Sequence, residues 1–127
     1  MAHEAAIKAA LGVMQDHIEG LNARDEAMIA ATLHFPHIRL STGGMKVWET
    51  SESYFTDFRA RAGSGWHRSS FEDIRVLQAS DNKVHLDAEI WRYGEGGAVY
   101  QTFRSLWVIT LQNGRWAAQM RSSFAPR

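Results

Sequence analysis

The chain has 127 residues, in which 14 Lys and Arg residues balance 14 Asp and Glu residues, and it contains no cysteine. This length suits one core, so residues 1–127 are expected to form a single domain. The balanced charge argues against nucleic acid or a membrane as partners, and the lack of cysteine excludes disulfides, thiolate catalysis and Cys-based zinc sites. Neither a secretion signal nor the ~20 apolar residues of a membrane span is found, which predicts a cytoplasmic location.

The first third of the sequence has the periodicity of helices. Apolar residues recur at three- and four-residue steps from about residue 2 to residue 21, which predicts one amphipathic helix. Its predicted buried stripe is Ile7, Ala10, Leu11, Met14, Ile18 and Leu21. A second, shorter helix must end by His34, because Phe35 precedes Pro36 and is disfavoured in a helix. The predicted apolar face of this helix is Ala27, Met28, Ala31 and Leu33.

A short strand pair and a third helix follow. Residues 37–41 alternate as a strand, Gly43 and Gly44 turn the chain, and residues 45–49 form the partner strand. In the first strand we expect Ile38 and Leu40 to face the helices, so that His37, Arg39 and Ser41 point away. Thr50 is the predicted N-cap of the third helix, with Glu52 near its positive end. Its predicted apolar face is Tyr54, Phe55, Phe58 and Ala62, and residues 62–65 should end it.

From Trp66 onward the period changes to two, and turn signals at residues 80–82, 94–97 and 112–114 delimit four long strands. In the second of these strands, the predicted inward residues are Val84, Leu86, Ala88 and Ile90, with Arg92. In the last two strands they are Phe103, Trp107, Ile109 and Leu111, then Trp116, Ala118, Met120 and Phe124. Helices followed by a meander predict an α+β fold, with three N-terminal helices on one face of a curved antiparallel sheet.

The predicted outer face of this sheet is rich in apolar side chains. They are Trp91, Tyr93, Tyr100, Leu106 and Val108. Because a contiguous apolar patch of this size marks an interaction surface, we predict a homodimer that packs through it. The alternative is a monomer with single exposed aromatic residues, which are common on protein surfaces.

The order of elements and four stretches of sequence resemble the nuclear transport factor 2-like superfamily, including its SnoaL-like branch. The stretches are LNARDEAMIAATLHFP (21–36), GWHRSSFEDIRVL (65–77), KVHLDAEIWRY (83–93) and LWVITLQNGRWAAQMRSSF (106–124). The resemblance covers nearly the whole chain and implies a cystatin-like α+β cone, with a ligand pocket between sheet and helices. The superfamily hosts isomerases, dehydratases, cyclases, non-catalytic subunits and carriers, so the fold alone assigns no activity.

The acids that the resemblance would lead one to expect are missing. Steroid-isomerase-like members have a carboxylate base near the end of the first strand, where this chain has Ser41 and Thr42. They have a second acid in the penultimate strand, where this chain has LWVIT (106–110), and SnoaL-like cyclases have a late aspartate, where it has AAQMRSSF (117–124). Proton abstraction beside a carbonyl by a buried carboxylate is therefore not expected.

The resemblance also implies a second set of catalytic residues, because in dehydratases of this fold a histidine and a tyrosine act together. The residues available for it are His34, His37, His67, Tyr54 and Tyr93. Histidine is a suitable general acid or base because its pKa lies near neutrality. Two-residue steps place His67 on one face with Ser69 and Phe71, near the pocket mouth, which makes His67 the candidate catalytic residue. The alternative for each histidine is a hydrogen-bonded residue at the edge of the core.

Arg92 ends the apolar face of its strand, where a buried guanidinium needs a partner. The partner is either a protein carboxylate, such as Glu49 or Asp57, or an anionic group of a ligand. In the second case Arg92 binds the ligand beside an aromatic wall. The candidate wall residues are Trp48, Tyr54, Trp66 and Trp107, for which the alternative is a place in the core.

His85, Asp87 and Glu89 alternate on one strand face and bring three potential metal ligands together. A polar strand exterior has the same pattern, so neither a metal site nor a cofactor is expected. His34 and His37 have the spacing of a helical ligand pair, but Pro36 prevents that helix.

The sequence therefore predicts a protein that binds a small, mostly apolar molecule carrying a carboxylate or a carbonyl group. Two alternatives remain open. One is a histidine-assisted lyase or isomerase, in which case the chain is an enzyme. The other is a non-catalytic subunit of a larger enzyme, such as a ring-hydroxylating dioxygenase, whose small subunits share the fold that the resemblance implies.

Overall fold

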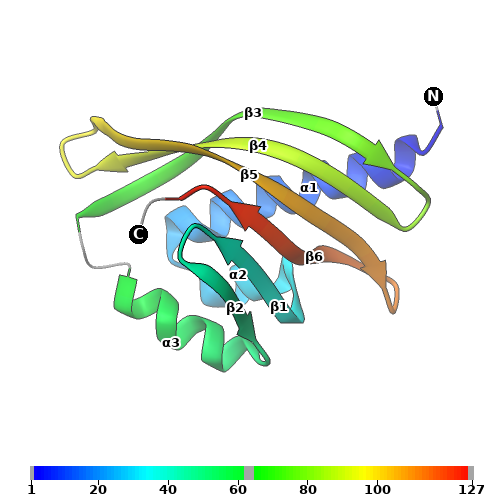
Figure 1. Ribbon diagram of the computed structural model, residues 1–127, viewed down its shortest axis with the longest axis horizontal. Helices are drawn as coiled ribbons and strands as arrows, with labels where there is room; N and C mark the ends of the chain where they lie inside the picture. Colours follow the sequence, from blue (N-terminus) through cyan, green and yellow to red (C-terminus); the bar gives the residue numbers. More distant parts are fainter. Residues whose placement is uncertain (1, 62–64, 126–127) are drawn as a thin grey trace.

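The computed structural model describes residues 2–61 and 65–125, which form three helices and six strands (Figure 1). In chain order they are α1 (Glu4–Ala23), α2 (Glu26–Ala31), β1 (Leu33–Ser41), β2 (Gly44–Trp48), α3 (Ser51–Arg61), β3 (Trp66–Ala79), β4 (Lys83–Gly94), β5 (Val99–Gln112) and β6 (Arg115–Ser123). The predicted α+β class and element order are confirmed. The predicted end of the third helix, with Ala62 on its apolar face, falls on residues 62–64, outside the described residues.

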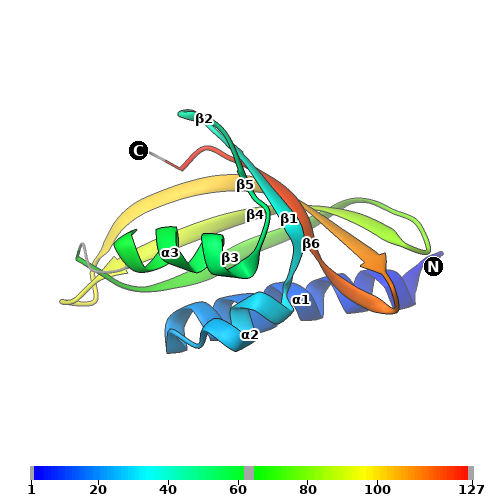
Figure 2. The ribbon, with the colours of Figure 1, turned by 90° about the horizontal axis from the view of Figure 1, so that it is seen from below.

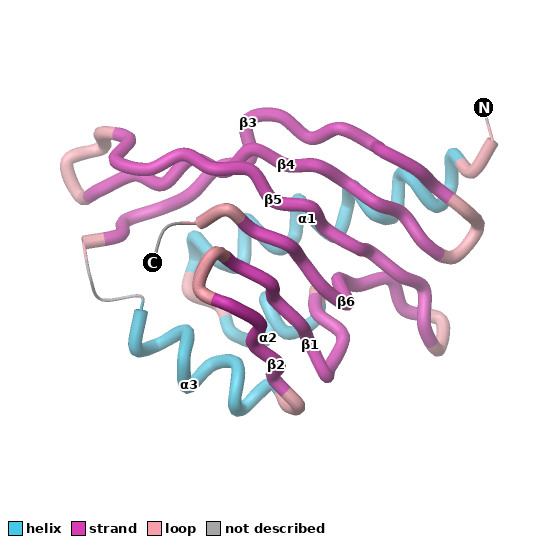
Figure 3. Tube along the Cα trace, in the orientation of Figure 1, coloured by secondary structure: helices cyan, strands magenta, loops and turns pink. Residues whose placement is uncertain are grey.

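The strands form one curved sheet in the order β2, β1, β6, β5, β4, β3. Neighbouring strands are antiparallel except for β1 and β6, which are parallel, so the sheet is not wholly antiparallel as the sequence had suggested. Figure 2 shows α1 and α2 side by side beneath one face of the sheet, and Figure 3 shows α3 beside β2. The helices therefore lie on one face, as predicted.

Helix α1 packs against both α2 and the sheet, and this rotates its buried stripe from the predicted one. The buried residues are Ala6, Ala10, Val13, Met14, His17 and Gly20. Of the predicted stripe, Ala10 and Met14 are confirmed, whereas Leu11 is exposed. No helix within the described residues is long and apolar enough to cross a membrane.

Both shorter helices begin at capping side chains. Asp25 Oδ1 accepts the Met28 N–H at 3.1 Å, and Thr50 Oγ1 accepts the Ser53 N–H at 3.2 Å, which confirms the predicted cap at Thr50. The predicted buried face of α3 is confirmed for Tyr54, Phe55 and Phe58.

Helix α2 is shorter than the apolar pattern suggested. It ends at Ala31, and Leu33, which the sequence placed on its apolar face, is the first residue of β1. The buried residue of α2 is Ile29, which the predicted face did not include. Strand β1 therefore begins earlier than predicted and contains Pro36.

The inner face of the sheet is predicted correctly in β4 and incorrectly in β1. The β4 residues Val84, Leu86, Ala88 and Ile90 are all buried. In β1, His37 is buried and Arg39 and Ser41 line the cavity described below, whereas Leu40 is 49% exposed. Because side chains alternate along a strand, choosing Ile38 and Leu40 as inward residues reversed the whole strand.

β-Bulges interrupt the side-chain alternation of the long strands, three of them in β3, one in β5 and one in β6. The extra residues, which the strand pairing skips, are His67, Glu72 and Leu77 in β3, Tyr100 in β5 and Gln119 in β6. Each bulge puts two residues opposite one on the neighbouring strand, so a two-residue step across it no longer stays on one face.

The bulge at Gln119 overturns the predicted face of the end of β6. Arg121 and Ser123 line the cavity, whereas Met120 and Phe124, predicted to face inward, are 37% and 71% exposed. Leu111, also predicted inward, is exposed because it lies at the end of β5. Tyr100, predicted on the outer face, is half-exposed and lines the cavity.

Two glycines of α1 give a matched test of how closely α1 packs on α2. A Cβ on Gly20 would lie 3.1 Å from the Ile29 backbone nitrogen, whereas one on Gly12 would have no neighbour within 4 Å. We expect Gly20→Ala to lower the free energy of unfolding by about 1–3 kcal/mol, because the backbone of Ile29 and the side chain of Met28 must shift to make room for the methyl group. Gly12→Ala should raise it by up to about 1 kcal/mol, because alanine favours a helix. Urea unfolding measures both, and a stabilising Gly20→Ala would contradict the close packing.

Candidate functional site

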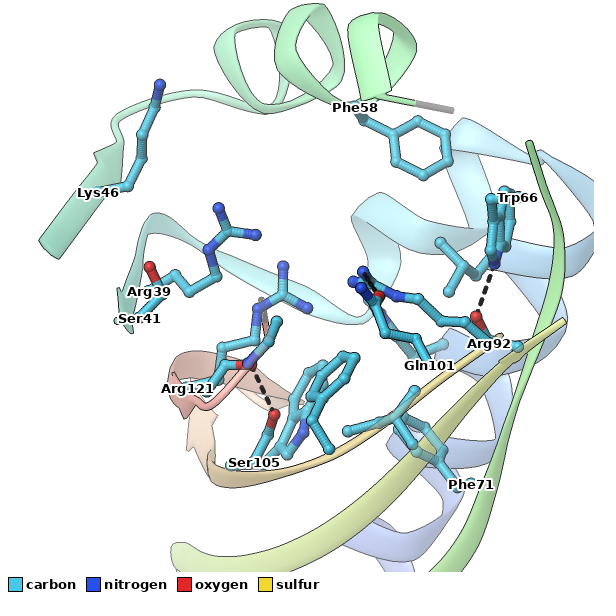
Figure 4. Close-up of a pocket in the computed structure, with 18 of the residues that line it drawn as sticks. Arg39, Ser41, Lys46, Phe58, Trp66, Phe71, Arg92, Gln101, Ser105 and Arg121 are labelled. Carbon is cyan, nitrogen blue, oxygen red and sulfur yellow. Dashed lines mark hydrogen bonds between the residues drawn. The ribbon is translucent and has the colours of Figure 1, made fainter. Parts of the chain in front are cut away.

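A cavity of about 690 Å³ lies between the inner face of the sheet and helices α1 and α3 (Figure 4). Side chains from α1, α3 and all six strands line it. Its volume falls in the range of small-molecule sites, roughly 300–1,000 Å³. The predicted pocket between sheet and helices is therefore present.

One row of side chains across the sheet gives the cavity its charge. Arg121 pairs with Trp107 on β5 and with Arg39 on β1, and Arg39 pairs in turn with Lys46 on β2. Paired residues of neighbouring strands share a face, so three cations lie side by side on three strands. Figure 4 shows the guanidinium groups of Arg39, Arg121 and Arg92 turned toward the same space.

Arg121 lies at the centre of this row. Its Nη2 donates to Tyr54 Oη at 3.1 Å, and its Cζ lies 5.0 Å from the centre of the Trp107 ring. Arg121 Nε and Trp107 Nε1 are buried donors that have no hydrogen-bond partner within the part of the chain that the structure describes. These two buried atoms do not reach the cavity, so the donors that Arg121 offers to a ligand are the terminal nitrogens of its guanidinium group, which Figure 4 shows turned into the cavity.

Arg92 lies on the opposite wall of the cavity, on β4. Its Nη1 donates to Gln101 Oε1 at 2.8 Å, and its Cζ lies 4.7 Å from the centre of the Phe103 ring. Asp57, one of the carboxylates weighed as its partner, accepts from Trp48 Nε1 at 2.8 Å and lies 2.8 Å from Lys46 Nζ. The hydrogen bond that Arg92 makes with Gln101 goes to a neutral amide, and Figure 4 shows the guanidinium group of Arg92 on the cavity side.

The rest of the lining is apolar, aromatic or neutral. The apolar and aromatic members include Ile18, Leu21, Phe58, Trp66, Phe71, Ile90 and Phe103. Among the described residues, no aspartate or glutamate lines the cavity. The lining therefore combines apolar walls with basic side chains, of which Lys46 is paired with Asp57.

His17, on α1, lies on the cavity wall and was not among the sequence candidates. It is 2% exposed, and its ring lies edge-on to Trp107 with 5.1 Å between ring centres. Its Nδ1 lies 2.8 Å from Thr32 Oγ1, and Thr32 Oγ1 donates to the Ile29 carbonyl oxygen at 2.7 Å. The sequence did contain a signal for it. His17 follows Ala10 by seven residues, which is two turns of a helix, so it lies on the same buried face of the predicted helix.

Burial and neighbouring positive charge keep His17 neutral. Burial lowers its pKa to about 3, with further lowering by the charges of Arg121 and His37. The pKa of His37 is likewise lowered to about 3, mainly by burial and then by Arg121. Both imidazoles are therefore uncharged at neutral pH.

His37 belongs to the core beneath the cavity. It is fully buried, stacks on Trp48 with 6.2 Å between ring centres, and its Nδ1 lies 3.1 Å from the Ala118 carbonyl oxygen. His34 lies elsewhere, with its Nε2 2.9 Å from the Thr110 carbonyl oxygen. The two histidines thus do not form a pair.

The structure brings together some of the residues selected from the sequence and separates others. Tyr54, Trp66, Arg92 and Trp107 all line the cavity. Trp48 is buried in the core and does not line it, and His67, the extra residue of the bulge in β3, is exposed and outside the lining.

The polar outer face of β4 is neutralised by an arginine of β5. Arg104 Nη2 lies 2.8 Å from Asp87 Oδ2 and 3.3 Å from Asp73 Oδ2, and Arg104 Nη1 lies 3.1 Å from Glu89 Oε1. A guanidinium in this position competes with any cation for the same oxygens. No group of three or more His, Cys, Asp or Glu residues within the described ranges is arranged to hold a metal ion.

No protein-family model matches the chain, and no curated protein matches it. Solved structures do match. A protein of unknown function with a cystatin-like fold from Nostoc punctiforme PCC 73102 is similar with a TM-score of 0.81 and 12% identity, over 97% of this chain and 92% of that chain. An NTF2-like protein from Cytophaga hutchinsonii ATCC 33406 is similar with a TM-score of 0.74 and 19% identity, over 99% and 100%. The hexachlorocyclohexane dehydrochlorinase LinA-type3 from Novosphingobium barchaimii LL02 is similar with a TM-score of 0.70 and 17% identity, over 95% and 87%.

The two neutral buried histidines predict acid sensitivity. Their folded pKa of about 3 lies below the ordinary 6.5, so between these values the unfolded chain binds more protons than the folded one. The free energy of unfolding should therefore fall as the pH decreases below 6.5, by up to about 1.4 kcal/mol per pH unit for each histidine. Urea unfolding between pH 7 and pH 4 measures this slope.

The carboxylates also contribute to the pH dependence of the free energy of unfolding, and a variant separates the contribution of His37 from theirs. His37→Gln retains a donor for the Ala118 carbonyl but does not titrate, so the slope should decrease by about 1.4 kcal/mol per pH unit. A slope equal to that of the wild type would show that His37 is not held neutral in the folded state.

Proposed function

This chain has the nuclear transport factor 2-like fold, as predicted, and we propose that it uses the cavity of that fold to bind a small amphipathic anion. The observation that carries the proposal is the row of Arg121, Arg39 and Lys46 on three neighbouring strands. Like charges placed opposite one another destabilise a sheet. Lys46 is paired with Asp57, so the repulsion that an anion in the cavity would relieve is the one between Arg121 and Arg39 on adjacent strands.

The chemistry of the lining narrows the kind of anion. A guanidinium matches a carboxylate through paired N–H donors, and Arg121 and Arg92 face the cavity from opposite walls. The remaining wall offers rings and aliphatic side chains, which favour an aromatic or alicyclic body. The ligand class that fits best is therefore a carboxylic acid with one or two rings.

A second candidate function is a histidine-assisted lyase or isomerase, and the position of His17 favours it. A neutral imidazole on the wall of a cavity can exchange a proton with a bound molecule. In this alternative His17 takes the role that the sequence assigned to His67, because the side chain of His67 does not reach the cavity. Arg121 would then stabilise negative charge that develops on the substrate.

We also propose that the chain forms a homodimer through the outer face of the sheet. Trp91, Tyr93, Leu106 and Val108 are half-buried there and lie beside the ion pairs of Arg104. Apolar residues rimmed by charges are typical of a surface that a second copy covers. The position of Tyr100 on the cavity side removes it from this surface.

The anion proposal predicts that 2-naphthoate binds to the purified protein and that Arg121→Met weakens the binding ten- to a hundredfold. A hydrogen bond to a charged group contributes about 1.5–3 kcal/mol, which corresponds to that range. Isothermal titration calorimetry measures the affinity, and circular dichroism checks that the variant is folded. The matched control is Arg75→Met, because Arg75 is exposed and pairs with Asp73 outside the cavity.

The neutral amide of the same ring system separates charge from shape. Binding of 2-naphthamide should be much weaker than that of 2-naphthoate in the wild type and little changed by Arg121→Met. If the amide binds as tightly as the acid, or if Arg75→Met has the same effect as Arg121→Met, the cavity does not select an anion.

The dimer proposal predicts twice the mass of the chain in sedimentation equilibrium. Val108→Glu should shift the mass to that of one chain, because it places a charge in the apolar outer face. Leu11→Glu, on the exposed face of α1, should leave the mass unchanged. A wild type with the mass of one chain at micromolar concentration would refute the dimer.

A further inference from the structure

The hydrogen-bonding role of His17, a polar side chain of the cavity wall, follows from the geometry around Thr32. Thr32 has a single hydroxyl proton, and it is donated to the Ile29 carbonyl oxygen at 2.7 Å. Thr32 Oγ1 can therefore only accept from His17 Nδ1, 2.8 Å away, so Nδ1 carries the ring proton. The lone pair of the neutral ring is then on Nε2, which makes Nε2 an acceptor.

This acceptor has no partner from the protein. Within the described residues no hydrogen bond reaches His17 Nε2, although the side chain is 2% exposed and forms part of the cavity wall. An acceptor in this position gains a hydrogen bond only when the molecule that fills the cavity supplies a donor.

We infer that the cavity selects a ring acid that also carries a hydroxyl group, with the hydroxyl donating to His17 Nε2 and the carboxylate facing the arginines. The inference rests on the proposed function, since it places the anion at the same arginines. His17 and Arg121 both lie against Trp107, with the His17 ring centre at 5.1 Å and Arg121 Cζ at 5.0 Å from it. One ligand with one or two rings can therefore contact both groups.

The charges around His17 determine which kind of donor group on a ligand can bond to its Nε2. The titratable and charged groups near it are Arg121 on β6, His37 and Arg39 on β1, and Arg92 on β4, and none of them is acidic. An ammonium donor would be repelled by the arginines, whereas a neutral hydroxyl would not. His17 also stays an acceptor at neutral pH, because burial and Arg121 lower its pKa to about 3.

The test compares 2-naphthoate with its 5-hydroxy, 6-hydroxy and 7-hydroxy derivatives and with their methyl ethers. At least one hydroxylated acid should bind the wild type about three- to tenfold more tightly than 2-naphthoate, the range expected for one hydrogen bond. Its methyl ether should lose that gain, because it has an oxygen but no proton to donate. Isothermal titration calorimetry at pH 7 gives the affinities.

Variants assign the gain to His17. His17→Phe keeps a ring against Trp107 but removes Nε2, so the hydroxylated acid and 2-naphthoate should bind with similar affinity. Thr32→Val frees the ring to move its proton to Nε2, so it should reduce the gain as well. His85→Phe is the control, because His85 also has a buried Nε2 without a hydrogen-bond partner in the described chain but lies outside the cavity lining.

A spectroscopic readout keeps the inference testable if His17→Phe does not fold. Long-range ¹H–¹⁵N NMR of the wild type should show a neutral His17 with its proton on Nδ1, and the Nε2 resonance should shift when the hydroxylated acid is added. A His17 with its proton on Nε2 would overturn the inference.

The outcomes separate the two proposals. If none of the naphthoates binds, the proposed anion function fails. If 2-naphthoate binds but no hydroxyl improves the affinity, or if the gain survives in His17→Phe, the hydroxyl inference fails while the anion function stands.

Discussion

Arg121 reaches the cavity because Gln119 is an extra residue in β6, and the chemistry of the site depends on where this guanidinium ends. On the inner face it lies beside Arg39, packs over Trp107 and donates to Tyr54 Oη. Its charge also contributes to the lowered pKa of His17. One irregularity of the backbone thereby adds a guanidinium to the positive charge of the cavity and reinforces the uncharged state of His17, which burial mainly causes.

The arrangement of the cavity is unfavourable for an empty protein. The guanidinium groups of Arg121 and Arg39 lie on adjacent strands, and their repulsion lowers the free energy of unfolding. Folded proteins retain unfavourable local arrangements of this kind at functional sites, and the rest of the hydrophobic core compensates for them. The same features become favourable once an amphipathic anion fills the cavity, which links the energetics of the fold to the proposed function.

The sequence predicts the elements well because periodicity and turn residues report on which side of each element meets the core. It predicts the site less well, because a β-bulge leaves no mark in an alternating pattern. The bulges moved His67 out of the predicted site, placed Tyr100 on the cavity side and turned Arg121 inward. His17 escaped notice for another reason: it lies within an apolar helical stripe, and only the hydrogen bond to Thr32, fifteen residues away, gives it a defined role. Arg92 and Trp107 were found because no bulge lies between them and the apolar residues that fixed the face of their strands.

The most direct test of this account is a crystal structure of the protein with 2-naphthoate at saturating concentration. The account predicts the naphthalene ring inside the cavity against Phe71 and Phe103, with the carboxylate about 3 Å from guanidinium nitrogens of Arg121 or Arg92. A ligand bound on the outer surface with the cavity unfilled, or a ring packed on the arginines with its carboxylate in solvent, would contradict it.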